Sequence, residues 1–240
     1  MSLPDRNGLA TDFHVHSTFS DDAVSTLAEN IAAGAERGLT ELRLVEHVRG
    51  STTWVPDFVS AVAGEPRPDG ILLRTGIEAK LLDASGALDL PAGLTGVDAV
   101  LIADHQFPGP DGPWSPREAR QRLAAGLSRQ DALDLLIGAM IGAMSAVESG
   151  QLAHCFSILP KVGLAEDDLT DDHLDRWAQT AAATNTLVEV NEKWGCPGPR
   201  VLAAAAAAGV TVVPATDSHL AAEVGRYRRV PLLLAEAGLR

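Results

Sequence analysis

The sequence has few cysteines and no long apolar run. Its two cysteines, Cys155 and Cys196, cannot form a disulfide framework, which favours a reducing cytoplasm. No run of about 18 apolar residues occurs, so no transmembrane helix is expected. The start of the chain, residues 1–4, is polar and contains a proline, unlike the apolar segment of a secretion signal. These features predict a cytoplasmic protein without a membrane partner.

Positive charge is also scarce in the sequence. Lysine and arginine number 19 against 32 aspartates and glutamates, so the formal net charge is −13 at pH 7. Nucleic-acid phosphates require a basic surface, and four tryptophans with one tyrosine provide no platform for stacking single strands. Stable nucleic-acid binding is therefore not expected. Carboxylates clustered around bound cations would explain part of the negative charge, since metal ions are absent from the count.

Strands and helices alternate along the chain. Hydrophobic residues make up 46% of the sequence, enough for one large core. Seven strands are predicted, at residues 12–16, 39–45, 71–77, 98–103, 152–153, 186–190 and 210–215. Helices are predicted at residues 24–37, 55–63, 115–147 with a break near 126–129, 172–183, 201–208 and 230–238. No linker or repeat divides residues 1–240, so this alternation predicts an α/β protein with a parallel sheet in one domain.

The segment Asp12-Phe-His14-Val-His16 reads as a strand with two different faces. Side chains alternate along a strand, so Asp12, His14 and His16 share one face, while Phe13 and Val15 share the other. A His-x-His pair alone is most often a pair of surface residues. The remainder of the chain decides between that reading and a metal site.

Residues that can bind metals recur at the carboxyl end of nearly every predicted strand. They are His14, His16, Glu46, His47, Glu78, His105, His154, Glu189, Asn191, Asp217 and His219. In a parallel barrel these ends converge on one mouth, where active sites lie. A single histidine in such a position is usually a hydrogen-bonded core residue. Six of the seven histidines occupy such positions, and a chain collects imidazoles and carboxylates at one mouth when a cation neutralises them.

The donor types indicate which metals the site would accept. Imidazole and carboxylate donors without thiolates suit zinc, manganese or iron. Cys155 follows His154, but strand alternation points it away from that histidine and predicts a buried structural thiol. The seventh histidine, His173, lies at the start of a polar helix and is predicted to be a solvated surface residue.

Taken in order, these residues resemble the PHP (polymerase and histidinol phosphatase) family. The matching motifs are Asp12-x-His14-x-His16-Ser-x-Phe-Ser-x-Asp22, Glu46-His47, Gly76-Ile-Glu78, His105, His154 and Asp217-x-His219. They cover nearly the whole chain and are most similar to the stand-alone hydrolases of the family. The sequence departs from the pattern at Asp22, where some members have histidine, and at Glu46, where many have aspartate.

The resemblance implies a distorted (β/α)7 TIM-like barrel that binds two to three divalent metal ions, namely zinc, manganese or iron. It assigns His14, His16, Glu78 and Asp217 to the first metal, with Glu78 bridging to the second. His105 and His154 complete the second site, and the third would be held by Asp22, His47 and His219. The catalytic chemistry falls to Glu78, Asp217 and His219.

The resemblance also implies an enzyme, a metal-dependent phosphatase or phosphoesterase. It would hydrolyse a small phosphomonoester, such as histidinol phosphate or a nucleotide, by means of a multinuclear metal centre and metal-bound hydroxide. A cationic clamp for the phosphate is expected, and four basic residues follow strand ends: Arg49, Lys80, Lys193 and Arg226. Each of these taken alone is more commonly a solvated surface charge.

Two other functions stay open at this stage. One is an amidohydrolase-like metal hydrolase that acts on C–N bonds, although the carbamylated lysine or single-metal pattern typical of that class cannot be located in this sequence. The other is a non-enzymatic metal-binding scaffold, against which the complete set of ligands argues. The physiological substrate and the oligomeric state do not follow from the sequence.

Overall fold

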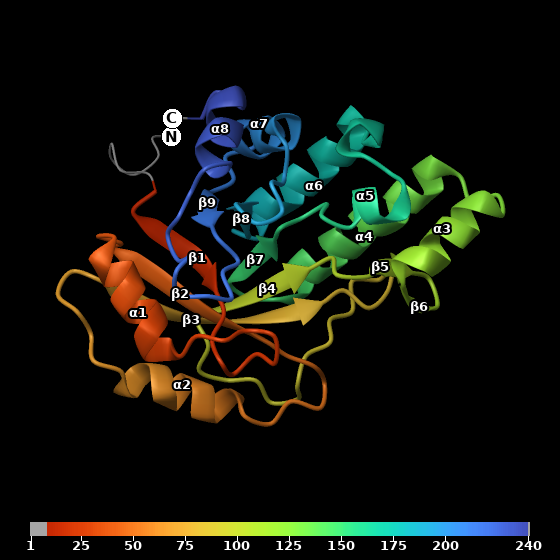
Figure 1. Cartoon of the computed structure of the whole chain (residues 1–240). Helices are drawn as coiled ribbons and strands as arrows, with labels where there is room; N and C mark the ends of the chain where they lie inside the picture. The colour runs from red at the N-terminus through yellow and green to blue at the C-terminus, as the bar shows by residue number, and fades with distance from the viewer. Residues whose placement is uncertain (1–8, 240) are drawn as a thin grey trace.

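Parallel strands wrap into a barrel at the centre of the computed structural model, which describes residues 9–239 (Figure 1). Within those residues the main sheet has seven strands, each parallel to its neighbours, in the order β1-β2-β3-β4-β7-β8-β9. Their bounds are Thr11–Val15, Glu41–His47, Leu72–Lys80, Ala99–Ala103, Gly150–Ala153, Leu187–Asn191 and Val212–Ala215. The expected absence of a secretion signal concerns residues 1–4, which lie outside the described part of the chain.

A backbone bridge brings the first and last strands together. Val15 at the end of β1 forms an isolated parallel bridge with Ser218, just after β9, and the His16 amide donates to the Ser218 carbonyl at 2.9 Å. The sheet is therefore a nearly closed barrel, and the α/β (β/α)7 architecture expected for the chain is confirmed.

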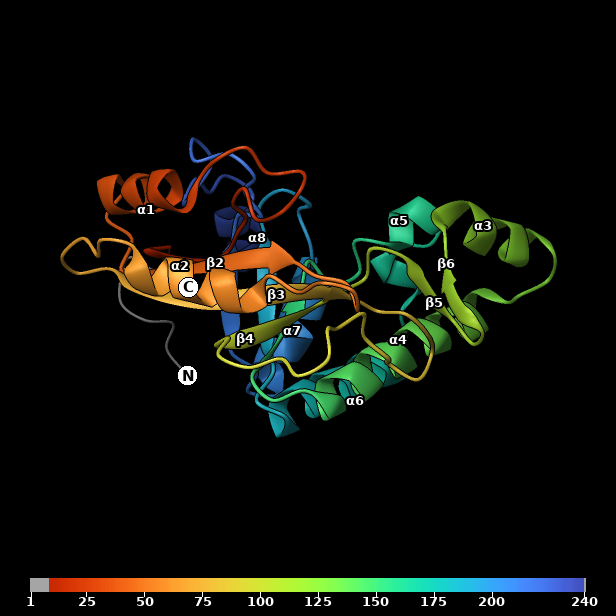
Figure 2. The same ribbon diagram turned by 90° about the horizontal axis from the view of Figure 1, so that it is seen from below.

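Helices surround the barrel and follow most of its strands. Their bounds are α1 Leu27–Glu36, α2 Val55–Gly64, α3 Pro116–Ala124, α4 Arg129–Ala146, α5 Leu159–Val162, α6 Asp171–Ala183, α7 Pro199–Ala207 and α8 Val230–Glu236, with a 3₁₀ turn at Glu166–Asp168. Helices α4 and α6 lie side by side on one flank, whereas α3 and α5 project from the barrel at one end (Figures 1 and 2). Among residues 9–239, no helix has the length and apolarity needed to cross a membrane.

The core has two parts because the strands are buried on both faces. All five residues of β4 are buried apolar residues, as expected for a strand with helices outside and a filled barrel inside. The larger part packs the helices onto the outer face of the sheet around Trp177, Leu136 and Phe156. Inside the barrel, small and branched side chains such as Val45 and Leu101 fill the lower layer. The polar residues occupy the layer above them at the mouth.

The segment from residue 107 to 116 corrects the sequence prediction of a loop. It forms a two-stranded antiparallel hairpin of β5 Phe107–Gly109 and β6 Gly112–Trp114. The rings of Phe107 and Trp114 stack with centroids 5.8 Å apart, and both residues are buried. A Cβ atom at Gly109 would overlap the Trp114 ring, so this glycine allows the stack. Proline and glycine composition predicts a turn, but this tertiary packing turns the segment into strands.

His173 is also placed differently from its prediction. It is only 3% exposed, and its Nε2 atom lies 3.1 Å from Oδ1 of Asp134. Its Nδ1 atom accepts a hydrogen bond from the Thr170 amide at the start of α6. The expectation of a solvated surface residue was wrong because α6 packs against α4, which carries Asp134. His173 is therefore a structural residue at the contact between α6 and α4.

Candidate metal centre

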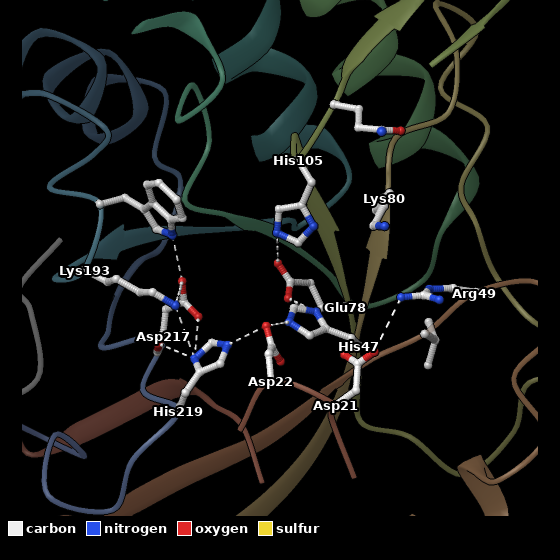
Figure 3. Close-up of a pocket in the computed structure, with 13 residues that line it drawn as sticks. Asp21, Asp22, His47, Arg49, Glu78, Lys80, His105, Lys193, Asp217 and His219 are labelled. Atoms are coloured by element: carbon white, nitrogen blue, oxygen red, sulfur yellow. Dashed lines mark hydrogen bonds and ion pairs between the residues drawn. The ribbon is translucent and has the colours of Figure 1, made fainter. Parts of the chain in front are cut away.

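The mouth of the barrel contains a cavity of about 360 Å³. Its lining residues come from segments far apart in the sequence, and all of them lie at or after the carboxyl ends of strands (Figure 3). They are Asp21, Asp22, His47, Val48, Arg49, Glu78, Lys80, His105, Gln106, Lys193, Trp194, Asp217 and His219. His14, His16 and His154 lie buried directly beneath this cavity among the same ligand-type side chains.

In the described part of the chain, three groups of side chains could each hold a metal ion, because the candidate donor atoms within each group lie within 4.8 Å of one another. The groups are His14, His16 and Asp217; Glu78, His105 and His154; and His16, His47 and His219. Asp22 adjoins the last group, with Oδ2 at 3.3 Å from Nε2 of His219 and 3.5 Å from Nε2 of His47. The structure thus brings all nine predicted metal ligands into one cluster.

Glu78 lies between these groups and is only 2% exposed. Its Oε1 atom is 2.9 Å from Nε2 of His154 and 3.1 Å from Nε2 of His105. Its Oε2 atom faces the opposite side, 3.4 Å from Nε2 of His14 and 2.8 Å from Nδ1 of His47 (Figure 3). The two oxygens of one carboxylate therefore point to different groups.

Two of the candidate ligands have an unusual backbone conformation. His154 has a φ of 29° and Asp217 a φ of 53°, values in the left-handed region that few residues other than glycine adopt. His154 follows β7 and Asp217 follows β9, so both residues turn the chain at the end of a strand. Such local strain occurs where surrounding structure fixes a side chain in place, and here it directs both side chains into the cluster.

The charges in the cluster are set by burial and by close neighbours. Burial, followed by the nearby His14 and His47, lowers the pKa of His16 to about 3, so its imidazole is neutral at pH 7. Burial opposes ionisation of Glu78, yet His105 and His14 hold the pKa of this carboxyl well below its usual range. Burial would lower the pKa of His154 as well, but Asp104 and Glu78 raise it to about 10. Protons on the histidines thus balance the carboxylates when no cation does.

The residues present fit a divalent metal centre. Oε2 of Glu78 is buried and receives no well-directed hydrogen bond, and Nε2 of His14 lies 2.9 Å from Nε2 of His16, so at most one proton lies between them. These oxygen and nitrogen atoms point at one another with lone pairs that a bound cation would accept. Binding of the cation would release the protons that the histidines otherwise carry. Taken together, the donors of the three groups are imidazoles and carboxylates without a thiol, which suits zinc, manganese or iron.

Polar side chains behind the histidines hold their other ring nitrogens. Oγ of Ser20 lies 3.3 Å from Nδ1 of His16 and donates to Glu46 at 2.6 Å. In the same way, Oγ of Ser157 lies 3.3 Å from Nδ1 of His154 and donates to Asp104 at 2.8 Å. Sequence analysis assigned no role to Ser20, although it lies in the first motif, and did not single out Ser157 or Asp104. The available indication was their position, since each lies close to a strand end.

Asp12 does not join the ligands, although strand alternation places it on the face of His14 and His16. The pairing of β1 with β2 shifts register between Asp12 and Val15, which breaks the simple alternation. The Asp12 carboxylate instead accepts hydrogen bonds from Thr216 and from the amide of Gly225. Asp12 therefore ties the last strand to the first.

Three of the four predicted phosphate-binding cations line the cavity. Arg49 and Lys80 lie on one side, and Lys193 lies on the other with its Nζ atom 3.6 Å from Oδ2 of Asp217 (Figure 3). Arg49 has an exposed ion pair with Asp21 at 3.7 Å. The fourth, Arg226, is exposed and is not among the cavity residues.

The position of Arg226 has a structural reason. On one side of it, the Gly225 amide bonds to Asp12, and on the other, the Tyr227 hydroxyl donates to the Thr11 carbonyl at 2.8 Å. Both partners are at the amino end of β1, opposite the mouth. The expectation that Arg226 follows the last strand into the site is therefore not supported.

Comparisons with known proteins point to phosphatases. No family model matches the chain. A protein of Caldicellulosiruptor saccharolyticus named "Probable phosphatase" is 31% identical over 108 residues, which are 43% of this chain and 45% of that protein. A second protein of that kind, from Vibrio parahaemolyticus, is 29% identical over 129 residues, 52% of this chain and 50% of its own length. The matched segments thus span about half the length of these curated relatives.

A solved structure matches over nearly the full length. It is a histidinol phosphate phosphatase from Lactococcus lactis subsp. lactis, complexed with zinc, L-histidinol and phosphate. The match covers 96% of this chain and 94% of that chain, with a TM-score of 0.60 and 16% sequence identity. At this identity, the likeness shows that the two chains share a fold.

Proposed function

We propose that this chain is a metal-dependent phosphatase of the PHP type that hydrolyses a small phosphomonoester. The observation that carries the proposal is the Glu78 carboxylate, whose two oxygens face different groups of metal-type ligands at the barrel mouth. The names of the two sequence relatives support phosphatase chemistry. The shared fold with an enzyme that binds zinc and phosphate supports the same assignment.

The candidate ligands would hold two to three ions. We assign His14, His16 and Asp217 to one ion and His105 and His154 to another, with Glu78 shared between them. Asp22, His47 and His219 would hold a third. Bound divalent cations would lower the pKa of water and neutralise charge on the phosphate oxygens, which are the two requirements of phosphoester hydrolysis.

Other side chains of the cavity would bind and orient the substrate. Lys193 has its Nζ atom near Asp217 and 3.3 Å from Nδ1 of His219, so its ammonium group can reach a phosphate oxygen placed over the cluster. Arg49 and Lys80 supply positive charge from the opposite wall. His219 and Asp217 would complete the catalytic set with Glu78, because they lie where the buried cluster meets the cavity.

The dimensions of the site suit a small substrate. A second hollow of about 270 Å³, lined by Phe19, Ser20, Asp21, His47, Arg49, Ser51, Thr52, Thr53 and Trp54, shares three of these residues with the main cavity. With the phosphate over the metal ligands, this hollow has room for the alcohol part of the substrate. Histidinol phosphate and nucleoside monophosphates are the substrates to test first. The two free thiols agree with a cytoplasmic location.

Activity assays on metal-depleted and reconstituted protein would test this function. Protein stripped with a chelator is supplied with zinc, manganese or iron and given histidinol phosphate, nucleoside monophosphates, p-nitrophenyl phosphate and a set of amides. We expect metal-dependent release of phosphate and no amide hydrolysis. Elemental analysis of protein never exposed to chelator should find two to three transition-metal ions per chain. Amide hydrolysis, or less than one ion per folded chain, would contradict the proposal.

A further inference from the structure

Glu189 is a fully buried carboxylate that contacts candidate ligands of two different metals. It lies in β8, beneath the cluster, and is 0% exposed. Its Oε2 atom is 2.9 Å from Nδ1 of His14, and its Oε1 atom accepts a hydrogen bond of 3.1 Å from the His154 amide. His14 and His154 belong to different ligand groups, so one side chain holds part of each.

Neighbouring amide groups fix the direction of the Glu189 carboxylate. Nε2 of Gln151 donates to Oε2 of Glu189 at 2.9 Å, and Nδ2 of Asn191 donates to Oε1 at 2.5 Å. Gln151 also donates to the carbonyl of Phe13, the residue before His14, at 3.2 Å. Both carboxylate oxygens therefore have a directed donor in addition to their contact with a histidine.

Arg43 completes this buried network from below. It is 7% exposed, its guanidinium donates to Oε1 of Gln151, and it lies 4.8 Å from the centre of the Phe13 ring. Among residues 9–239, no carboxylate lies within ion-pair distance of Arg43. The amide of Gln151 thus connects a buried cation to a buried anion, and neither Arg43 nor Gln151 lines the cavity at the mouth. Burial of a cation and an anion costs desolvation free energy, so stability alone does not explain this arrangement.

We propose that Glu189, held by Gln151 and Arg43, is a positioning residue that sets the spacing of two metal sites. A carboxylate on Nδ1 of a histidine keeps the proton there and leaves the Nε2 lone pair free for a metal. Nε2 of His14 does face inward, toward Nε2 of His16 and Oε2 of Glu78. The bond to the His154 amide fixes that residue in its left-handed conformation. The inference rests on the metal-dependent function proposed above.

Zinc affinity of a Glu189→Gln variant would test this role. The glutamine keeps the length of the side chain, but one carboxylate oxygen is replaced by an NH₂ group. Each of the two oxygens of Glu189 accepts from an N–H donor, so in either orientation the NH₂ group would face a donor that it cannot accept from. We expect zinc binding, measured by competition with a chromophoric chelator, to weaken about 10- to 100-fold at two sites together. Glu166→Gln is the matched control, because Glu166 is a partly buried carboxylate that accepts from the Gly198 amide and contacts no candidate ligand.

The melting temperature of the metal-free proteins distinguishes positioning from a purely structural role. A structural role would lower the melting temperature of Glu189→Gln and leave its zinc affinity within about threefold of the wild type, which would overturn the inference. If this variant does not fold, Gln151→Met provides the test. It removes the donor to Glu189 and the acceptor for Arg43, and it replaces the amide with an apolar side chain of similar length. Weaker zinc binding by Gln151→Met supports the inference, and unchanged binding overturns it.

The experiment separates failure of this inference from failure of the proposed function. Wild-type protein that binds zinc and releases phosphate, beside a Glu189→Gln variant with unchanged zinc affinity, overturns the positioning role alone. Wild-type protein that binds no zinc, manganese or iron overturns both the metal centre and the positioning role.

Discussion

The indole nitrogen of Trp194 donates a hydrogen bond of 2.8 Å to Oδ2 of Asp217. The other carboxylate oxygen, Oδ1, lies 3.3 Å from Nε2 of His16. Trp194 is 39% exposed on the wall of the cavity, and Nζ of Lys161 lies 3.9 Å from the centre of its ring. The indole thus occupies one oxygen of a candidate metal ligand and directs the other oxygen inward.

Loss of this hydrogen bond should lower catalytic efficiency. Trp194→Phe keeps an aromatic ring but leaves Oδ2 of Asp217 free to turn, so we expect kcat/KM for p-nitrophenyl phosphate to fall about tenfold, or ~1.4 kcal/mol. Trp114→Phe is a close control: Trp114 also donates to an aspartate, Asp111, at 2.8 Å and has Arg122 over its ring, but it lies outside the cavity. Equal losses in the two variants would show that the Trp194 bond has no specific role.

The third metal site should depend on Asp22. Within residues 9–239, its carboxylate is the one acidic group in ion-pair distance of both His47 and His219, and it is half exposed. We expect Asp22→Ala to bind about one ion fewer per chain by elemental analysis. Without the Asp22 carboxylate, the imidazoles of His47 and His219 would hold a divalent ion only weakly. Asp21→Ala is the control, since Asp21 is the adjacent residue but pairs with Arg49. Wild-type metal content in Asp22→Ala would contradict the assignment of Asp22 to a third metal site.

Eight of the nine candidate ligands could be predicted from sequence because each lies at a strand end, whereas Asp22, in the loop after β1, was assigned only through the family resemblance. Strand position is a local property, so His14, Glu78 and Asp217 are each recognisable without knowledge of what they contact. The supporting role of Glu189 is not recognisable in this way, although it too was placed at a strand end. Glu189 and His14 are 175 residues apart, and their contact depends on the closure of the barrel. Alternation placed Asp12 on the face of His14 and His16, but its carboxylate does not join theirs, because the pairing of β1 with β2 shifts register between Asp12 and Val15.

The errors in the fold prediction also arise from contacts between distant residues. The hairpin at residues 107–114 depends on the stacking of Phe107 on Trp114, which its turn-like composition conceals. His173 is buried by a helix that begins 44 residues earlier, at Arg129, and by its contact with Asp134. In contrast, the break between α3 and α4 and the capped start at Ser115 are local features, and both were predicted correctly.

Stability should change with pH through Glu166. Burial raises the pKa of Glu166 from its ordinary value of 4.5 to about 7. The folded protein therefore holds this proton more tightly than the unfolded chain, and the resulting stabilisation, full below pH 4.5, is lost as the pH rises to about 7. Glu166→Gln does not titrate, so between pH 4.5 and 7 its free energy of unfolding should rise relative to the wild type by about 1 to 2 kcal/mol.

Urea denaturation of metal-free wild type and Glu166→Gln at several pH values would measure this difference. The difference between the two proteins removes the contribution of all other titrating groups, because the variant retains them. The amide oxygen of the variant can still accept from the Gly198 amide, so the fold should be preserved. A difference that stays constant from pH 4.5 to 8 would show that Glu166 has an ordinary pKa.

Glu78→Gln should have the largest effect on turnover of any single substitution considered. The variant keeps the shape of the side chain but removes its charge, and one of its two oxygens becomes an amide group that cannot be shared between metals. We expect two ions to be lost together in a chelator titration and kcat to fall about 10³-fold, or ~4 kcal/mol. Asp171→Asn, in an exposed ion pair with Arg200 at the start of α6, should change kcat by less than about twofold. Full metal content with near-normal turnover in Glu78→Gln would show that this carboxylate is not shared between two metal ions.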